Sequence, residues 1–262
     1  KKRIMNCKSI ILLIVVLLFW GNAEARKKKG KKVEEVQTES AYRKFFKGKA
    51  CETAKGMITL HKMDGRVYFE IPLALMGREM LMGSTISEIT NNGFGSVGEK
   101  PKGLLYISFV RCDSVISLKQ LTAQYDTNEE NLKQRIKEST IPATIKNFKI
   151  TTYNEDSTAV VIDMTDYLVS ADEAIDPFSP WAPILAGGER VMEKEFRREN
   201  SQVVSIKAFE DNVSVKSSLT YGLSLKNKVM YIFQREPFTA VMTRSFILLP
   251  EHPMRPRLAD PR

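Results

Sequence analysis

The sequence has few residues that bind metals or act as general bases, with two histidines and three cysteines among 262 residues. Because His61 and His252 lie far apart, the chain lacks the His-Glu-x-x-His pattern, in which two zinc ligands lie one helical turn apart beside a general base. It also lacks Gly-x-Ser-x-Gly, Gly-x-x-x-x-Gly-Lys and Cys-x-x-Cys motifs. No motif therefore identifies a catalytic residue, a cofactor-binding residue or a metal ligand in this chain.

We expect structural roles, and not catalytic ones, for the histidines and aspartates that could take part in catalysis. His61 falls within an apolar run, where we expect a half-buried or solvent-facing strand residue, and His252 lies among prolines. Asp163 and Asp166 could serve as an acid and a base. Because Asp166 follows a strand-forming run, we expect it to cap or initiate the next turn instead.

Basic residues are concentrated at the start of the chain. Residues 1–32 hold ten of the 40 lysines and arginines but one of the 31 acidic residues, which leaves 30 of each sign in residues 33–262. A nucleic-acid-binding domain carries its positive charge on the folded surface that follows the phosphates, so the neutral body argues against a nucleic-acid partner. The run Arg26–Lys32 is typical of a solvated tail that could touch anionic lipid or polysaccharide.

Long apolar runs are also scarce. Ile10–Trp20 has 11 residues, whereas a transmembrane helix needs about 20. With lysines before this run and Ala23-Glu24-Ala25 after it, the pattern predicts a signal peptide over residues 1–25. Residues 26–40 lack hydrophobic periodicity and are typical of a basic, flexible linker. We therefore expect an exported protein, located in the periplasm, in the cell envelope or outside the cell, with no transmembrane span after cleavage.

Two cysteines, Cys51 and Cys112, remain after such a cleavage. In an oxidising compartment a disulfide between them would close a loop of about 60 residues and stabilise the fold by about 2–4 kcal/mol. The sequence does not show whether their Cα atoms lie close enough for a bond. The alternative is two separate buried thiols.

Alternating apolar residues indicate strands from Met57 onward. Met57–Lys62 and Arg66–Ile71 flank an Asp-Gly pair, which suits the positive φ angles of a tight hairpin. Pro72 is expected to begin a short helical turn that Gly77 ends. Later strands are expected at Glu79–Ile89, Leu104–Val110, Val115–Leu121, Ile145–Tyr153, Thr158–Met164, Val203–Phe209, Val213–Leu219, Val229–Gln234 and Ala240–Leu249.

Helices are expected to be few and short. Asn128–Glu138 has acidic residues early and basic residues late, and Tyr42, Phe45 and Phe46 recur on one helical face. The prolines of Asp176–Pro183 predict a surface loop. We therefore predict an α+β fold that is mainly antiparallel β, with a few short helices and two strand-rich units. The smaller unit covers residues 41–95, and the larger covers residues 96–262 and is truncated at its C-terminal end.

Five segments are weakly specific one by one but specific in their order and spacing: Gly65–Pro72, Gly77–Glu79, Val160–Thr165, Phe209–Val213 and Leu249–Arg262. Together they resemble the uncharacterised two-part N-terminal region of exported zinc-dependent metalloproteases from the Bacteroides group of bacteria. In that family the region leads into a zincin catalytic domain, which holds the functional residues. The Val-Gly-Tyr-Phe-like stretch that typically follows the closing Asp-x-Arg is absent here.

The resemblance implies an accessory region that assists folding, inhibits the enzyme or positions substrate, and that is inactive alone. No cofactor is expected in this chain, because zinc would lie in the missing catalytic domain. The implied partners are that C-terminal metalloprotease domain in cis and a protein or peptide substrate. Candidates for an ion-paired contact with the catalytic domain are Arg255, Arg257, Asp260 and Arg262. The alternative is that these residues form a solvated charged linker.

A second function, from a different class, is also open. The chain could be a self-contained cell-envelope β-sheet protein that binds glycan or peptide, since its neutral body, its aromatic residues and its leader permit this. The reading frame beyond Arg262 distinguishes the two functions. A stop codon favours the binding protein, and a frame that encodes His-Glu-x-x-His favours the protease.

Overall fold

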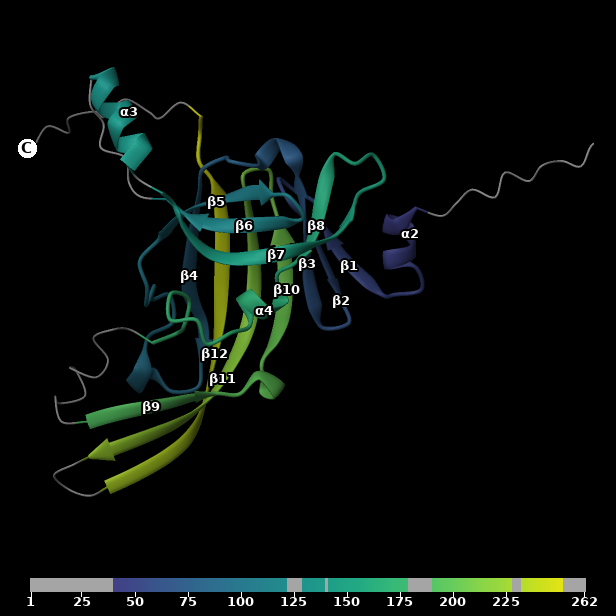
Figure 1. Ribbon diagram of the computed structural model, residues 1–262. Coiled ribbons are helices and arrows are strands. Elements are labelled where there is room, and N and C mark those ends of the chain that lie inside the picture. The colour runs from purple at the N-terminus through teal and green to yellow at the C-terminus, as the bar shows by residue number, and fades with distance from the viewer. Residues whose placement is uncertain (1–39, 122–128, 140, 179–189, 228–231, 252–262) are drawn as a thin grey trace, which may run out of the picture. The chain divides into compact units, whose positions relative to one another are not determined.

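The computed structural model describes residues 40–121, 129–139, 141–178, 190–227 and 232–251 (Figure 1). Its helices are α2 (Ala41–Phe46), α3 (Glu130–Ser139) and α4 (Thr165–Leu168), with 3-10 turns η1 (Leu73–Leu75), η2 (Asn92–Phe94) and η3 (Arg198–Asn200). Its strands are β1 (Cys51–Ala54), β2 (Thr59–Met63), β3 (Arg66–Pro72), β4 (Met80–Ile89), β5 (Leu105–Cys112), β6 (Val115–Gln120), β7 (Ala143–Tyr153), β8 (Ala159–Asp163), β9 (Arg190–Phe196), β10 (Gln202–Ala208), β11 (Asn212–Asn227) and β12 (Ile232–Leu248). Within these ranges, no helix is long and apolar enough to cross a membrane.

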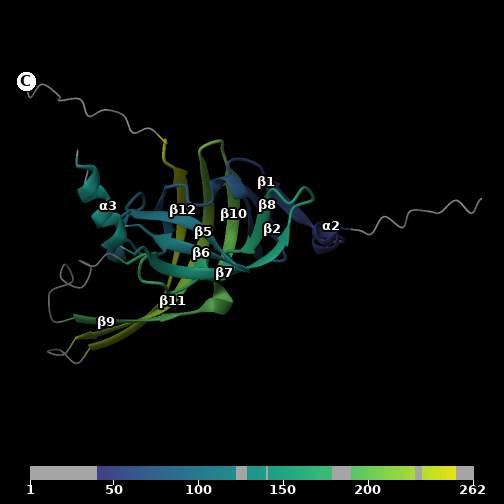
Figure 2. The ribbon, with the colours of Figure 1, turned by 45° about the horizontal axis from the view of Figure 1, so that its top comes forward.

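The strands form one antiparallel sheet in the order β1-β2-β3-β8-β7-β6-β5-β4-β12-β11-β10. One half of β11 pairs with β10 and the other half pairs with β9. Figure 1 shows β5, β6 and β7 crossing in front of the long strands β4, β11 and β12, and Figure 2 shows the same two layers from another angle. The prediction of a mainly antiparallel β fold with a few short helices is confirmed.

The turn between β2 and β3 follows directly from the sequence. Asp64 has a φ of 52° and Gly65 has a φ of 72°, as the Asp-Gly pair predicts, and Met63 pairs with Arg66 across the turn. A short turn after Pro72 and a positive φ of 78° at Gly77 also agree with the prediction. Local sequence therefore determines the local turns.

Strands from both parts of the chain pair with one another, so the prediction of two strand-rich units, at 41–95 and 96–262, is not confirmed. β3 pairs with β8, where Phe69 lies opposite Ile162, and β4 pairs with β12, where Met82 lies opposite Phe246. A hairpin leaves its two outer edges unpaired, and a buried edge needs a partner. In this protein the partners lie far away in the sequence.

The two ends of the strand order also approach each other. The amide of Met57, just before β2, donates a hydrogen bond of 2.7 Å to the carbonyl of Phe209, just after β10, and Lys62 Nζ donates to the carbonyl of Val204. Gly56 permits this approach, because a Cβ atom at this position would lie 2.3 Å from the Phe209 oxygen. The sheet therefore curls round a shared interior.

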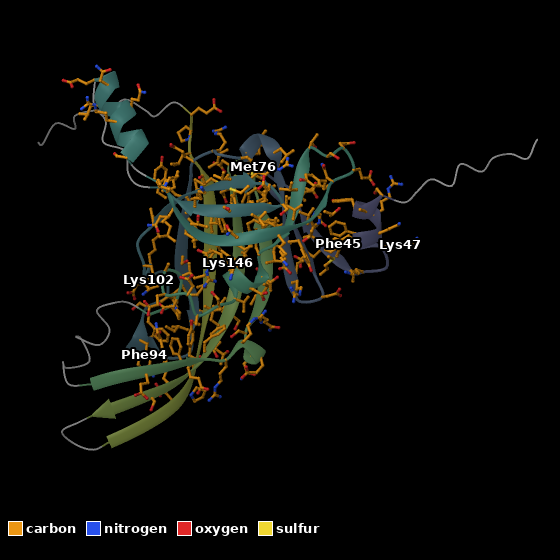
Figure 3. The ribbon with its side chains drawn as sticks, viewed as in Figure 1. Phe45, Lys47, Met76, Phe94, Lys102 and Lys146 are labelled. Carbon is orange, nitrogen blue, oxygen red and sulfur yellow. The ribbon has the colours of Figure 1, made fainter. Side chains whose placement is uncertain are left out.

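Inward-facing side chains fill this interior. Phe246 of β12 lies at its centre, with ring centroids 5.4 Å from Phe69 and 6.2 Å from Phe109. Phe94 of η2 closes another side by packing against Phe238, with the centroids 5.5 Å apart (Figure 3). Burying an apolar side chain of this size stabilises a fold by about 1.5–3 kcal/mol, so this core provides most of the driving force.

Strands β11 and β12 are longer than the sequence indicates, at 16 and 17 residues. The separate strands expected at Val229–Gln234 and Ala240–Leu249 are one strand from Ile232 onward, which passes through Pro237. The sheet tolerates Pro237 because the pairing of β12 with β4 already ends at Ala240 and Ile89. Beyond that point β9, β11 and β12 extend as a three-stranded arm (Figure 1).

The segment after β8 enters the interior. Residues 165–178, named here the interior segment, contribute Tyr167, Ile175 and Phe178 to the core, and Phe178 lies with its ring centroid 5.1 Å from that of Tyr221. The prediction of a surface loop over Asp176–Pro183 is wrong for residues 176–178, which are buried, while residues 179–183 lie outside the described part. The prolines indicated irregular backbone correctly, but the neighbouring apolar side chains bury that backbone.

Candidate functional site

Asp176 is a fully buried carboxylate in the interior segment. Its Oδ1 lies 3.1 Å from Lys102 Nζ, and Lys194 Nζ of β9 contacts its Oδ2. The amide of Phe178 also donates to Oδ1, at 3.2 Å. Burial of a charge costs several kcal/mol unless the charge is paired, and here two ammonium groups and an amide satisfy the carboxylate. Asp176 therefore connects the interior segment to β9.

Arg244 of β12 is a fully buried cation in the same interior. Its Nη2 donates a hydrogen bond of 2.9 Å to the carbonyl of Ile175, the residue before Asp176. Among the described residues no partner reaches Arg244 Nε or Nη1, and the same holds for the hydroxyls of Tyr167, Tyr221 and Ser217. These groups are donors that a hydrogen-bond acceptor could use.

The electrostatics of this interior follow from burial. Burial lowers the pKa of Arg244 to about 10, and the nearby Tyr221, Tyr167, Asp172 and Asp176 oppose that shift. Burial likewise raises the pKa of Tyr167 and of Tyr221 well above the ordinary value. Arg244 therefore stays a cation at neutral pH while both phenols stay neutral.

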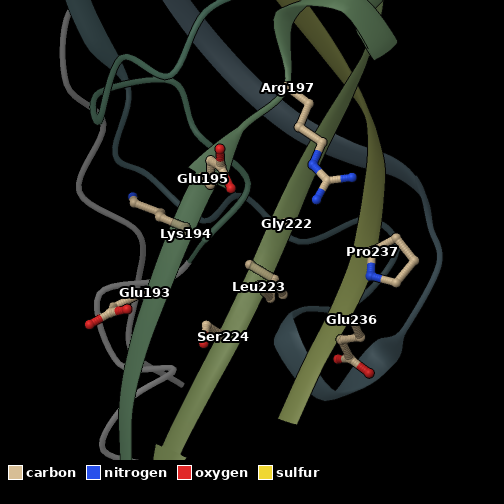
Figure 4. Close-up of a pocket in the computed structure, with 9 residues that line it drawn as sticks. All are labelled: Glu193, Lys194, Glu195, Arg197, Gly222, Leu223, Ser224, Glu236 and Pro237. Atoms are coloured by element: carbon tan, nitrogen blue, oxygen red, sulfur yellow. The ribbon is translucent and has the colours of Figure 1, made fainter. Parts of the chain in front are cut away.

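An open groove of about 580 Å³ lies along the arm (Figure 4). Three neighbouring strands, β9, β11 and β12, contribute its lining, together with Arg197 just after β9. The lining residues are Glu193, Lys194, Glu195, Arg197, Gly222, Leu223, Ser224, Glu236 and Pro237.

Gly222 keeps the floor of the groove low. A Cβ atom on Gly222 would lie 3.0 Å from Arg197 Nη2, so the missing side chain lets the guanidinium lie close over β11. Gly222 pairs with Glu195 on one side and with Pro237 on the other. Leu223 pairs with Lys194 and with Glu236, so these two side chains lie on the opposite face of the arm from Glu195, and Asp176 engages Lys194 there. Arg197 lies over the Gly222 face, which Glu195 shares.

The outer edge of β9 is a second feature of this region. In the part of the chain that the structure describes, β9 pairs with β11 alone. An unpaired strand edge offers a row of backbone N–H and C=O groups to another extended chain. The groove therefore combines charged side chains with a backbone edge.

The residues that the sequence singled out lie elsewhere. Arg255, Arg257, Asp260 and Arg262 fall outside the described residues, so their predicted contact stays a prediction. Cys51 on β1 and Cys112 at the end of β5 are free thiols in the structure. His61 is more deeply buried than expected, at 5% exposure.

Two further observations concern acidic residues. Asp163 accepts a hydrogen bond of 2.9 Å from the amide of Thr165. Asp166 lies in the first turn of α4, the turn that we expected it to cap or initiate. Among the residues that the structure describes, no group of three or more His, Cys, Asp or Glu side chains could hold a metal ion.

Sequence reasoning missed Arg244 and Asp176. A signal for Arg244 was present, because Phe238, Ala240, Met242 and Phe246 alternate with outward residues and Arg244 occupies the same inward register. A charged residue at an inward position of an apolar strand indicates a buried polar site. No comparable pattern marks Asp176.

Comparisons with known proteins give a family but no activity. No curated protein and no solved structure matches the chain. One family model, DUF5118, a domain of unknown function, matches residues 39–89, and a second, DUF5117, also a domain of unknown function, matches residues 99–262. Two consecutive uncharacterised domains agree with a two-part region of uncharacterised function. The DUF5117 match covers more than half of the chain, so the chain belongs to the DUF5117 family.

Proposed function

We propose that this region is a non-catalytic accessory module of a larger exported zinc metalloprotease, where it holds an extended segment of polypeptide substrate. The ordered motifs that resemble the N-terminal region of such enzymes support the enzyme context, and the two adjacent domains agree with a two-part organisation. The observation that carries the binding role is the groove of the arm, because β9 contributes to its lining and, among the described residues, pairs with β11 alone.

The groove suits an extended peptide that adds a strand to β9. Main-chain hydrogen bonds to the edge of β9 that lacks a strand partner among the described residues would supply affinity, and the groove side chains would supply selectivity. Glu195 of β9 shares the Gly222 face of the arm and lies on the strand that the peptide would join, so a peptide with a basic side chain opposite Glu195 fits best.

Buried charges hold β9 in place for this role. Arg244 holds the carbonyl of Ile175, and the adjacent Asp176 binds Lys194 of β9. An edge strand fixed in this way loses less conformational freedom when a peptide binds, and such preorganisation increases affinity. Arg244 and Asp176 therefore act as positioning residues for the groove.

Two experiments test the enzyme context. The gene is read past the codon for Arg262, where an open frame that encodes His-Glu-x-x-His is expected. A stop codon there would favour the self-contained cell-envelope protein that binds glycan or peptide. The purified region is also incubated with casein and zinc, and no cleavage is expected. Zinc-dependent, chelator-sensitive cleavage would contradict the accessory role.

A third experiment tests the groove. Fluorescence anisotropy measures the binding of labelled lysine-rich and glutamate-rich β-forming peptides to the purified region. We expect the lysine-rich peptides to bind more tightly, with an affinity that falls as salt rises. Glu195→Lys should weaken this binding at least about tenfold. Glu88→Lys, the same charge change on an exposed residue of β4, is the matched control and should leave binding unchanged.

A further inference from the structure

A separate cluster of polar side chains lies where α2 covers β1, β2 and β3. Tyr42, Phe45 and Phe46 of α2 pack there around Met63 and Tyr68. Figure 3 shows Phe45 on α2 beside these strands, and its ring lies 5.1 Å from that of Tyr68, centroid to centroid. The sequence correctly placed the three aromatic residues of α2 on one face.

His61 lies at the centre of this cluster. Its Nε2 is 2.9 Å from Glu70 Oε2, and Tyr42 donates a hydrogen bond of 2.7 Å to the same oxygen. On the other side of the ring, Nδ1 is 3.0 Å from Thr53 Oγ1 and 3.8 Å from Cys51 Sγ. Cys51 Sγ is also 3.6 Å from the Thr53 hydroxyl.

Glu70 determines which nitrogen of His61 carries the proton. The hydrogen bond from His61 holds the pKa of Glu70 below its ordinary value, and burial opposes that shift. An ionised carboxylate only accepts hydrogen bonds, so Nε2 must be the N–H group. In the neutral ring Nδ1 then carries the lone pair, and this lone pair faces Thr53 and Cys51.

We propose that Cys51 is a nucleophilic thiol, that His61 is the base that accepts its proton, and that Glu70 orients the imidazole. This order of groups is the general arrangement of an activated nucleophile, in which a third group orients the base. The co-reactant is a small disulfide. The proposal concerns a site distinct from the groove and does not depend on the proposed function.

The reaction is thiol–disulfide exchange. The Cys51 thiol gives its proton to His61 Nδ1, directly or through the Thr53 hydroxyl, and its sulfur attacks one sulfur of the disulfide. A new S–S bond forms at Cys51, the S–S bond of the reagent breaks, and the departing thiolate takes the proton from His61. The product is a mixed disulfide at Cys51 and one free thiol.

The competing explanation is that the cluster only fastens α2 to the sheet. The two explanations predict opposite results. If the contacts are only structural, weakening them loosens α2, exposes Cys51 and increases its rate of modification. If His61 is the base, its removal decreases that rate even though Cys51 becomes more accessible.

Cys112 provides an internal comparison. It is exposed at the end of β5, whereas Cys51 is partly buried. In the described part of the chain Cys112 Sγ has a contact of 3.6 Å from the Ser117 hydroxyl and none from a histidine. Accessibility alone therefore predicts that Cys112 reacts faster, and the proposal predicts the opposite order.

The test measures the rate of reaction with Ellman's aromatic disulfide at neutral pH. Cys112→Ser leaves Cys51 as the measured thiol, Cys51→Ser leaves Cys112, and both proteins also carry Cys7→Ser. We expect Cys51 to react at least about tenfold faster than Cys112, and His61→Gln to remove that advantage. Tyr42→Phe, which keeps the imidazole but removes a contact of α2, should leave the rate unchanged or increase it.

Two outcomes would overturn the proposal: a rate at Cys51 no higher than at Cys112, or an unchanged or higher rate in His61→Gln. Circular dichroism establishes whether His61→Gln folds. If it does not fold, Glu70→Gln replaces it, because the amide keeps the size of the side chain and removes the charge. A severalfold decrease is expected in Glu70→Gln, and an unchanged rate would exclude the role of His61 as the base.

Discussion

Arg78 and Glu251 form an ion pair of 2.7 Å between Nη1 and Oε1, which joins the start of β4 to the residues after β12. Arg78 Nη2 also donates to the carbonyl of Leu249 at 3.2 Å, and the amide of Leu249 donates to the carbonyl of Glu79 at 3.0 Å. The chain therefore leaves the sheet beside the Gly77–Glu79 turn, in contact with it.

Arg78→Ala should loosen the contact between the residues after β12 and the start of β4, and should leave the rest of the sheet unchanged. The ion pair is largely exposed on the Glu251 side, so its loss should change the free energy of unfolding by less than about 1 kcal/mol. We expect hydrogen exchange at the Leu249 amide to become faster, while exchange at Phe246 stays slow. An unchanged rate at Leu249 would show that the backbone bond to Glu79 holds the exit without help.

Gly56→Ala should destabilise the protein by about 1–3 kcal/mol or more, measured by urea unfolding. The new Cβ would lie 2.3 Å from the Phe209 oxygen and 2.6 Å from its nitrogen, and these backbone atoms have little freedom to shift. Gly103→Ala is the matched control, because no atom lies within 4 Å of its Cβ position. A normal stability in Gly56→Ala would contradict the close approach of β2 and β10.

Arg244→Met should stabilise the protein by about 1–3 kcal/mol and weaken peptide binding. Methionine keeps most of the volume and removes a buried cation that lacks a carboxylate at hydrogen-bond distance among the described residues. The lost bond to Ile175 should loosen β9 and its groove. Arg244→Ala controls for volume and should destabilise through the cavity. Lower stability in Arg244→Met would mean that the hydrogen bond to Ile175 and the neighbouring polar groups stabilise the guanidinium by more than its burial costs.

Glu70 should make stability depend on pH in the acid range. Its pKa is lowered in the folded state, so the ionised form contributes stability that is complete above the unfolded pKa of about 4.3. That contribution decreases as the pH falls below this value and through the folded pKa. Glu70→Gln should therefore flatten the decrease in melting temperature below about pH 4.3. An unchanged pH profile would show that Glu70 is not ionised in the fold.

The boundary between the two family matches does not coincide with a boundary in the fold. One family match ends at residue 89 and the next begins at residue 99, on either side of the division between residues 95 and 96 that the sequence predicts. The sheet ignores this boundary, because β4 on one side pairs with β12 on the other. A boundary of sequence similarity is therefore not a boundary of folding here.

The candidate sites could not be predicted from the sequence, because tertiary structure brings their side chains together. Cys51, His61 and Glu70 belong to three different strands, and only the pairing of those strands brings the three side chains together. No sequence pattern indicated that Asp176 is buried, because its burial follows from the packing of Ile175 and Phe178 in the core. Lys194 lies on a strand that the sequence analysis did not identify at all.

The sequence by itself determined the features that depend on neighbouring residues. These are the Asp64-Gly65 turn, the short turn between Pro72 and Gly77, the aromatic face of α2 and the alternation that makes most strands. The tertiary structure alone decided strand order, the inward course of residues 165–178 and the positions of the buried charges. The physical reason is that turns and amphipathic faces are set by local backbone and solvent preferences, whereas long-range pairing depends on which distant edge and which apolar face fit together.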